Sequence, residues 1–68
     1  MKYFERMKEL RIERGETQTA VAEAIDMTTR QYQRYEAGSQ KPGLDYLMAL
    51  ADHFEVTLDY LTGRTGER

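Results

Sequence analysis

The chain has 68 residues, which is enough for one domain and too few for a large core. It contains no cysteine, so disulfides are excluded and a reducing, intracellular compartment is expected. No apolar run approaches the ~18 residues of a membrane span, and no signal-peptide core is found, so we expect a soluble, cytoplasmic chain with no membrane partner. Stability must then come from helix packing, from a partner chain, or from both.

Charge is unevenly distributed along the chain. The net charge of −2 argues mildly against nucleic acid as a partner. However, residues 27–43 have a local charge of +2, from Arg30, Arg34 and Lys41 against Glu36. Residues 44–61 have a local charge of −4, from Asp45, Asp52, Glu55 and Asp59 with no Lys or Arg. The sequence therefore predicts a basic side that can bind a polyanion and an acidic side that repels one.

The first two predicted elements are helices. Residues 4–14 carry Phe4, Met7, Leu10 and Arg11 at helical spacing, and Gly15 ends this helix. Thr17 is the predicted N-cap of a second helix that runs to about Ile25. Its inner face is expected to be Val21, Ala22 and Ile25. Asp26 and Met27 form a tight connection to the next helix.

Residues 28–36 form the third predicted helix. Thr28 caps it, Gln31 completes a capping box three residues later, and Gly38 follows its end near Ala37. At ~100° per residue, one side carries no acid and consists of Thr29, Arg30, Gln33 and Arg34. The opposite arc holds Thr28, Tyr32, Tyr35 and Glu36.

Two further helices complete the prediction of an all-α fold. After a loop over 39–43, the residues at 44–54 form a helix with Leu44, Leu47, Met48 and Ala51 at helical spacing. Thr57 caps a short helix that holds Leu58 and Leu61 and ends at Gly63. We expect one domain over 1–68, with its core at about 4–62 and a flexible tail at 63–68.

Several polar residues have both a functional and a structural interpretation. Arg, Gln and Thr can read guanine, adenine and thymine edges, but most polar helix faces are only solvated, so composition leaves both readings of 28–36 open. Gln18, at a helix start, and Lys41, in a loop, could bind phosphates or be ordinary surface residues. Arg11 and Glu36 lie on inward arcs and predict a partly buried structural ion pair.

The stretch from Leu10 to Leu61 resembles the lambda-repressor/Cro-like helix-turn-helix family, also called the XRE family. The segments that carry the resemblance occur in order and without a gap. They are Leu10-Arg11, Gly15-Glu16-Thr17-Gln18, Val21-Ala22, Ile25, Tyr35-Glu36-Ala37-Gly38, Lys41-Pro42, Leu47-Met48-Ala49-Leu50-Ala51 and Val56-Thr57-Leu58-Asp59-Tyr60-Leu61. Each segment is weak alone, whereas the ordered set is specific.

The resemblance implies a compact five-helix bundle that binds double-stranded DNA. It implies base contacts from Thr29, Arg30 and Arg34, with Gln33 on the same face. It implies backbone contacts from Gln18, Thr28 and Lys41, and a structural bridge between Arg11 and Glu36.

Two positions depart from the family pattern. Asp26 replaces the glycine that is usual in the turn, and aspartate tolerates a positive φ with some strain. Glu16 replaces an apolar residue, so we expect one core contact fewer and an acid near the phosphate-facing end of the 17–25 helix.

These observations favour a sequence-specific transcriptional regulator, expected to be a repressor, that places 28–36 in the major groove and acts as a homodimer. Candidates for the pairing surface are Phe54, Tyr60, Leu61 and Tyr46, although core is the better interpretation for Phe54 and Leu61. The alternative is an antitoxin-like or adaptor module that binds a protein through its acidic half. No catalytic arrangement, cofactor, small-molecule ligand or metal site is predicted, because the one histidine, His53, has no ligands spaced around it.

Overall fold

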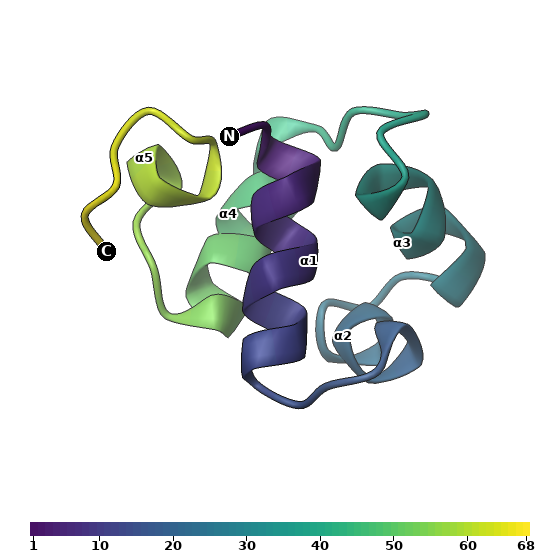
Figure 1. The fold of residues 1–68 in the computed structure, drawn as a ribbon. Coiled ribbons are helices and arrows are strands. Elements are labelled where there is room, and N and C mark those ends of the chain that lie inside the picture. Colours follow the sequence, from purple (N-terminus) through teal and green to yellow (C-terminus); the bar gives the residue numbers. More distant parts are fainter.

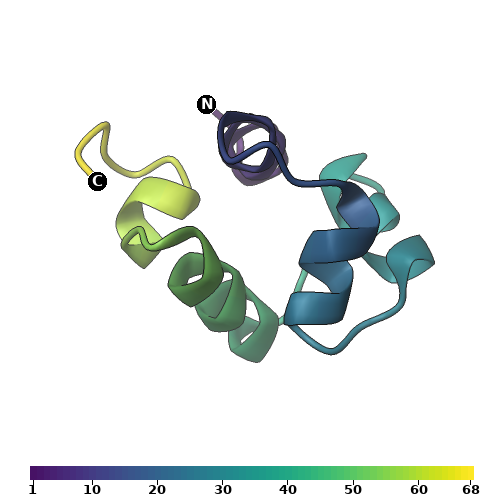
Figure 2. The same cartoon turned by 90° about the horizontal axis from the view of Figure 1, so that it is seen from below.

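The computed structural model describes residues 1–68 and contains five helices and no strand, which confirms the predicted all-α class. The helices are α1 (Tyr3–Glu13), α2 (Gln18–Ala24), α3 (Thr29–Glu36), α4 (Leu44–Phe54) and α5 (Leu58–Leu61). Helix α1 runs through the middle, with α2 and α3 on one side of it and α4 and α5 on the other (Figures 1 and 2). No helix is both long and apolar enough to cross a membrane.

Threonine caps define three of the helix starts. The hydroxyl oxygens of Thr17, Thr28 and Thr57 accept hydrogen bonds from backbone N–H groups three residues later, at 3.0, 3.1 and 3.1 Å. Only the Thr28 half of the expected capping box at α3 is formed. Gly15 and Gly38 follow α1 and α3 with φ of +69° and +79°, as a C-terminal glycine requires.

One core joins all five helices. It consists of Met7, Leu10, Val21, Ala22, Tyr32, Tyr35, Leu50, Ala51, Phe54, Tyr60 and Leu61. One arginine side chain, that of Arg6, is also buried beside this core, with only 8% of its surface exposed. Its Nη1 donates to the Tyr60 carbonyl oxygen at 2.9 Å and its guanidinium lies 3.8 Å from the centre of the Tyr60 ring, so α1 is fastened to α5.

The apolar residues noted at helical spacing in α4 are not all buried. Leu44 and Met48 are 65% and 48% exposed, whereas Leu50 and Phe54 are buried. The helix is therefore rotated so that 47, 50, 51 and 54 face the core. The stripe 44, 47, 48 and 51 and the stripe 47, 50, 51 and 54 share Leu47 and Ala51. Helical spacing alone therefore does not distinguish the buried stripe from the exposed one.

The same core removes most of the expected pairing surface. Phe54 and Leu61 are core residues, as favoured, but Tyr60 is also buried and cannot pair two copies. Only Tyr46 remains accessible, at 38%, with its ring centre 6.1 Å from that of Tyr35.

The C-terminal segment 63–68 contacts both α5 and the C-terminal end of α1. The Arg64 N–H donates to the Asp59 carbonyl oxygen at 2.8 Å. The Arg68 guanidinium pairs with Glu13 on α1 and lies over the Tyr60 ring. The flexibility expected of this tail stays a prediction.

Candidate nucleic-acid interface

The α2–turn–α3 unit is closed by backbone hydrogen bonds. Asp26 has φ +58°, as its position in the turn required. The N–H groups of Asp26 and Met27 donate to Glu23 and Ala22 at 3.2 and 2.9 Å. Val21, Ala22 and Tyr32 are fully buried, so α2 and α3 contribute to the same core.

Helix α3 has one exposed and one buried side. Arg30, Gln33 and Arg34 are exposed and Thr29 is half-buried. Tyr32, Tyr35 and Glu36 face the core. We call Thr29, Arg30, Gln33 and Arg34 the outer strip; it faces solvent as the helical arc predicted. Thr28 is also exposed, at the start of the helix.

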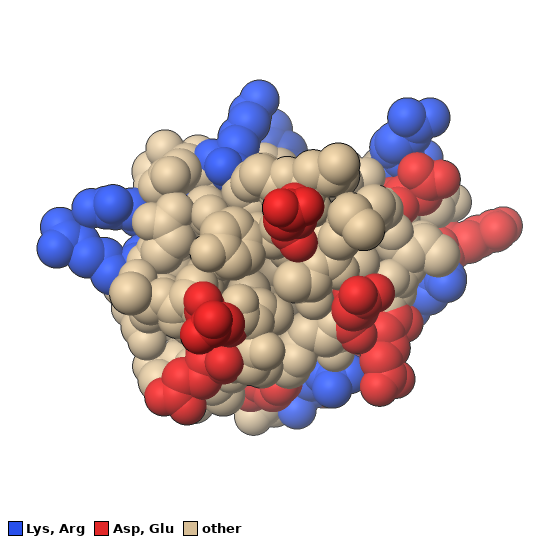
Figure 3. All heavy atoms as spheres, turned by 180° about the vertical axis from the view of Figure 1, so that it is seen from behind, with Lys and Arg blue, Asp and Glu red and all other residues tan.

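The basic side chains of this region have no acidic partner. Arg11, Arg14, Arg64 and Arg68 each form an ion pair within the molecule. Arg30, Arg34 and Lys41 form none, so their charges are available to an external anion. On the face opposite to that of Figure 1, acidic side chains are spread across the surface and basic ones lie at its edges (Figure 3).

Gln18 lies between α2 and α3 instead of pointing freely into solvent. Its Nε2 donates to Glu36 Oε1 at 3.3 Å, and its Oε1 accepts from Gln33 Nε2 at 3.3 Å. A neighbouring contact was not anticipated: the Thr29 hydroxyl donates to the Thr19 hydroxyl oxygen at 3.2 Å. Thr19 is exposed one position after Gln18, so a threonine here extends the polar surface.

Beneath the outer strip, Arg11 and Glu36 form a bidentate pair. Arg11 Nη2 and Nε donate to the two Glu36 oxygens at 2.7 and 2.9 Å, and the side chains are 14% and 4% exposed. Burial alone would raise the pKa of Glu36, but the hydrogen bonds from Arg11 and its neighbours lower it overall. Burial raises the pKa of the adjacent Tyr32 phenol, whose oxygen has no hydrogen-bond partner.

Glu16 was expected to be a lost core contact and an acid facing phosphate. It lies directly before the N-cap of α2, and its carboxylate is 2.9 Å from His53 Nε2 on α4 and 3.0 Å from Arg14 Nε. The side chain is only 21% exposed. The carboxylate therefore joins the start of α2 to α4 and forms an ion pair with Arg14.

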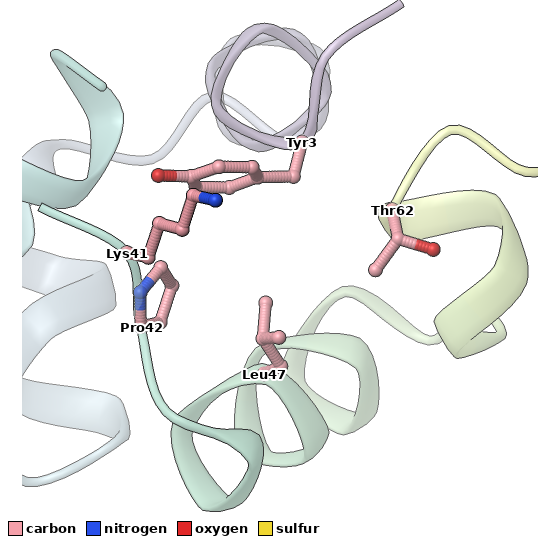
Figure 4. A pocket seen from close by; sticks show the side chains of 5 residues that line it. All are labelled: Tyr3, Lys41, Pro42, Leu47 and Thr62. Carbon is pink, nitrogen blue, oxygen red and sulfur yellow. The ribbon is translucent and has the colours of Figure 1, made fainter.

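Lys41 lines a hollow of about 190 Å³ together with Tyr3, Pro42, Leu47 and Thr62 (Figure 4). The Tyr3 hydroxyl donates to the Gln40 carbonyl oxygen at 3.2 Å, which ties the loop to α1 and positions exposed Lys41. No group of three or more His, Cys, Asp or Glu side chains is arranged to hold a metal ion.

Comparison with known proteins gives consistent matches. A family model described as helix-turn-helix matches residues 7–61. The uncharacterized HTH-type transcriptional regulator YobD of Bacillus subtilis is 38% identical over 65 residues, covering 96% of this chain and 58% of YobD. The cryptic phage CTXphi transcriptional repressor RstR of Vibrio cholerae is 34% identical over 64 residues, covering 94% of this chain and 57% of RstR. The chain thus spans little more than half the length of these relatives, which are named as regulators and not as enzymes.

Solved structures give the same fold. A transcriptional regulator from Listeria innocua has a TM-score of 0.87 and 30% identity, over 98% of this chain and 63% of that one. The P22 c2 repressor, solved with a synthetic operator, has a TM-score of 0.85 over 90% of this chain and 92% of its own, at 21% identity.

Proposed function

The chain belongs to this helix-turn-helix family, and on that premise we propose that it binds double-stranded DNA sequence-specifically and represses transcription. Helix α3 lies in the major groove in this proposal, and residues 1–68 form a single DNA-binding domain that works in the cytoplasm. The relatives named as regulators and repressors support this role.

The observation that carries the proposal is the outer strip with its unpaired cations. It presents hydroxyl, amide and guanidinium groups with no carboxylate. Such groups match the donors and acceptors on base edges, and the ~12 Å width of the major groove admits a helix. In this proposal Thr29, Arg30, Gln33 and Arg34 contact bases.

Phosphate contacts fix the position of the domain on the duplex. We assign them to Gln18 and Thr28, at the starts of α2 and α3, and to Lys41 in the loop after α3. One such helix reads only a few base pairs, so two copies on a palindromic site would supply specificity. The proposed active form is therefore a homodimer.

The experiment begins with genome-wide selection of bound DNA, which gives the half-site and the spacing together. The selected site is then titrated with Arg30→Ala and Arg34→Ala. Each loss of a base contact should weaken binding by about tenfold or more. Arg64→Ala is the control, because Arg64 lies beyond α5, at the other end of the molecule from α3, and should leave binding unchanged. Equal affinity for all four proteins would contradict the assignment of α3.

A protein-binding module is the second candidate. The observation that favours it is that Leu44 and Met48 are exposed on α4, beside the exposed carboxylates of Asp45 and Asp52. Co-purification of a partner, together with no DNA binding at low salt, would support this function over the first.

A further inference from the structure

Four side chains form one hydrogen-bonded series from the interior to the surface of α3. Arg11 donates to Glu36 at 2.7 and 2.9 Å, Gln18 donates to Glu36 at 3.3 Å, and Gln33 donates to Gln18 at 3.3 Å. The first two are part-buried and buried, Gln18 is half-buried and Gln33 is exposed. The series therefore connects a buried ion pair with the outer strip.

The chemistry of Glu36 gives this series a direction. An ionised carboxylate can only accept hydrogen bonds, whereas a carboxamide has a donating end and an accepting end. Gln18 must therefore turn its NH₂ group to Glu36 and its carbonyl oxygen to Gln33. Gln33 must in turn donate one of its N–H bonds to Gln18.

The reverse orientations bring two acceptors together. If Gln33 alone turned over, its carbonyl oxygen would face that of Gln18. If Gln18 turned over as well, its oxygen would face the Glu36 carboxylate. The pKa of Glu36 remains low despite burial, because Arg11 and other donors hydrogen-bond to it, so the carboxylate stays ionised at neutral pH.

We propose that Glu36 is a positioning residue that sets the hydrogen-bond polarity of the outer strip, so that Gln33 presents its carbonyl oxygen and one N–H to DNA. That pair matches the amino group and N7 of adenine, and it mismatches guanine, which offers two acceptors on the same edge. This inference rests on the proposed function and deepens it: it names a base preference and its internal cause.

The orientation can be tested first without DNA. In ¹⁵N-labelled free protein, the Gln18 side-chain amide protons should show nuclear Overhauser contacts to Glu36, and those of Gln33 should show contacts to Gln18. Glu36→Gln should abolish the preferred orientation, since a neutral amide can donate as well as accept. Glu16→Gln is the matched control, because Glu16 contacts Arg14 and His53 and should leave these signals unchanged.

The base preference is tested on the selected DNA site with single base-pair changes. The native chain should prefer adenine over guanine by about tenfold or more at one position of the half-site, and Gln33→Ala should remove that preference. Glu36→Gln should reduce it to less than about threefold. Gln18→Leu should do the same while keeping both charges of the Arg11–Glu36 pair in place, so it serves if Glu36→Gln fails to fold.

The results separate the inference from the proposed function. If the native chain binds DNA and both Glu36→Gln and Gln18→Leu keep the adenine preference, the inference is overturned while the function stands. If the native chain binds no DNA, the proposed function fails and with it the base preference. The orienting role of Glu36 is then supported or overturned by the amide contacts in the free protein.

Discussion

Arg11 and Glu36 form the pair on which α1 and α3 depend. Removing one partner leaves a buried charge without compensation, so Arg11→Met should lower the free energy of unfolding by about 3 kcal/mol or more. Arg14→Met, which breaks the more exposed pair with Glu16, should cost less than about 1 kcal/mol. Urea denaturation followed by circular dichroism measures both.

The double variant Arg11→Met/Glu36→Leu makes this prediction sharper. It removes both charges together, so it should recover much of the stability that Arg11→Met loses. Equal losses in Arg11→Met and Arg14→Met would show that burial of the pair has no energetic consequence.

Glu36 also predicts a pH dependence. Its pKa in the folded chain lies below the ordinary carboxyl value of 4.5, so the stabilisation from its ionised form is complete above that pH. The stabilisation is lost as the pH falls through the lower, folded-state pKa. The difference in unfolding free energy between the native chain and Glu36→Gln should therefore shrink as the pH falls below 4.5.

Other carboxylates are present in both proteins, so their contributions to the pH dependence cancel when the two unfolding free energies are subtracted. The Arg68 hydrogen bond lowers the pKa of Glu13, for example, but Glu13 is present in both proteins. A difference that stays constant as the pH is lowered below 4.5 until the chain unfolds would contradict the role given to Glu36.

Single residues show where sequence reasoning reaches its limit. The pairing of Arg11 with Glu36 was foreseeable because both lie on inward helical arcs. The burial of Arg6 was not, since it depends on Tyr60, which lies 54 positions away along the chain. The Glu16–His53 contact likewise joins residues 37 positions apart, and no local pattern announces it.

At the scale of helices, α4 offers a direct test of its orientation. Leu50→Ala removes a fully buried side chain and should cost about 2–5 kcal/mol. Met48→Ala, on the same helix, should change stability by less than about 0.5 kcal/mol because Met48 is largely exposed. Thermal and urea unfolding would distinguish them, and a larger loss for Met48→Ala would restore the inward face that spacing had suggested.

Two turns are made by non-glycine residues with positive φ. Glu55 ends α4 with φ 58° and ψ 44°, and Asp26 has φ 58° between α2 and α3. Left-handed geometry costs about 1–2 kcal/mol for such residues, more than the entropy that glycine loses, so Glu55→Gly should stabilise the chain by about 0.5–1 kcal/mol.

Two further variants calibrate that effect. Asp26→Gly should stabilise less, because aspartate tolerates this geometry better. Gly15→Ala should destabilise by about 1 kcal/mol through its backbone alone, since a Cβ at Gly15 would meet no atom within 4 Å. A destabilised Glu55→Gly variant would contradict the strain assigned to this turn.

The number and the limits of the helices were predictable because their signals are local. Threonines at 17, 28 and 57 and glycines at 15, 38 and 63 mark starts and ends whatever the rest of the chain does. Which side of α4 is buried was not predictable in this way. The helix has two overlapping apolar stripes, and only packing in the folded core selects between them. For the outer strip, periodicity on one short helix sufficed to predict exposure; its DNA contacts stay a prediction.

Over the whole molecule the net charge is −2, although residues 27–43 have a local charge of +2 and residues 44–61 one of −4. Binding should therefore depend on a small number of phosphate contacts, and the logarithm of the binding constant should fall with the logarithm of salt concentration by about 0.9 per contact. Lys41→Ala should reduce this slope by about 1 and weaken all DNA sequences alike. Arg64→Ala should leave the slope unchanged, and an unaltered slope for Lys41→Ala would remove Lys41 from the interface.

The contact between Gly63 and the N-terminal residue has a practical consequence. Gly63 lies against the Met1 carbonyl group, where any added Cβ would come within 2.1 Å of the oxygen. Both ends lie toward α5 and away from α3 (Figures 1 and 2). A tag that immobilises the protein on a sensor chip through Arg68 should therefore leave α3 facing the flowing solution. Gly63→Val should displace the N-terminal residue from its contact with position 63.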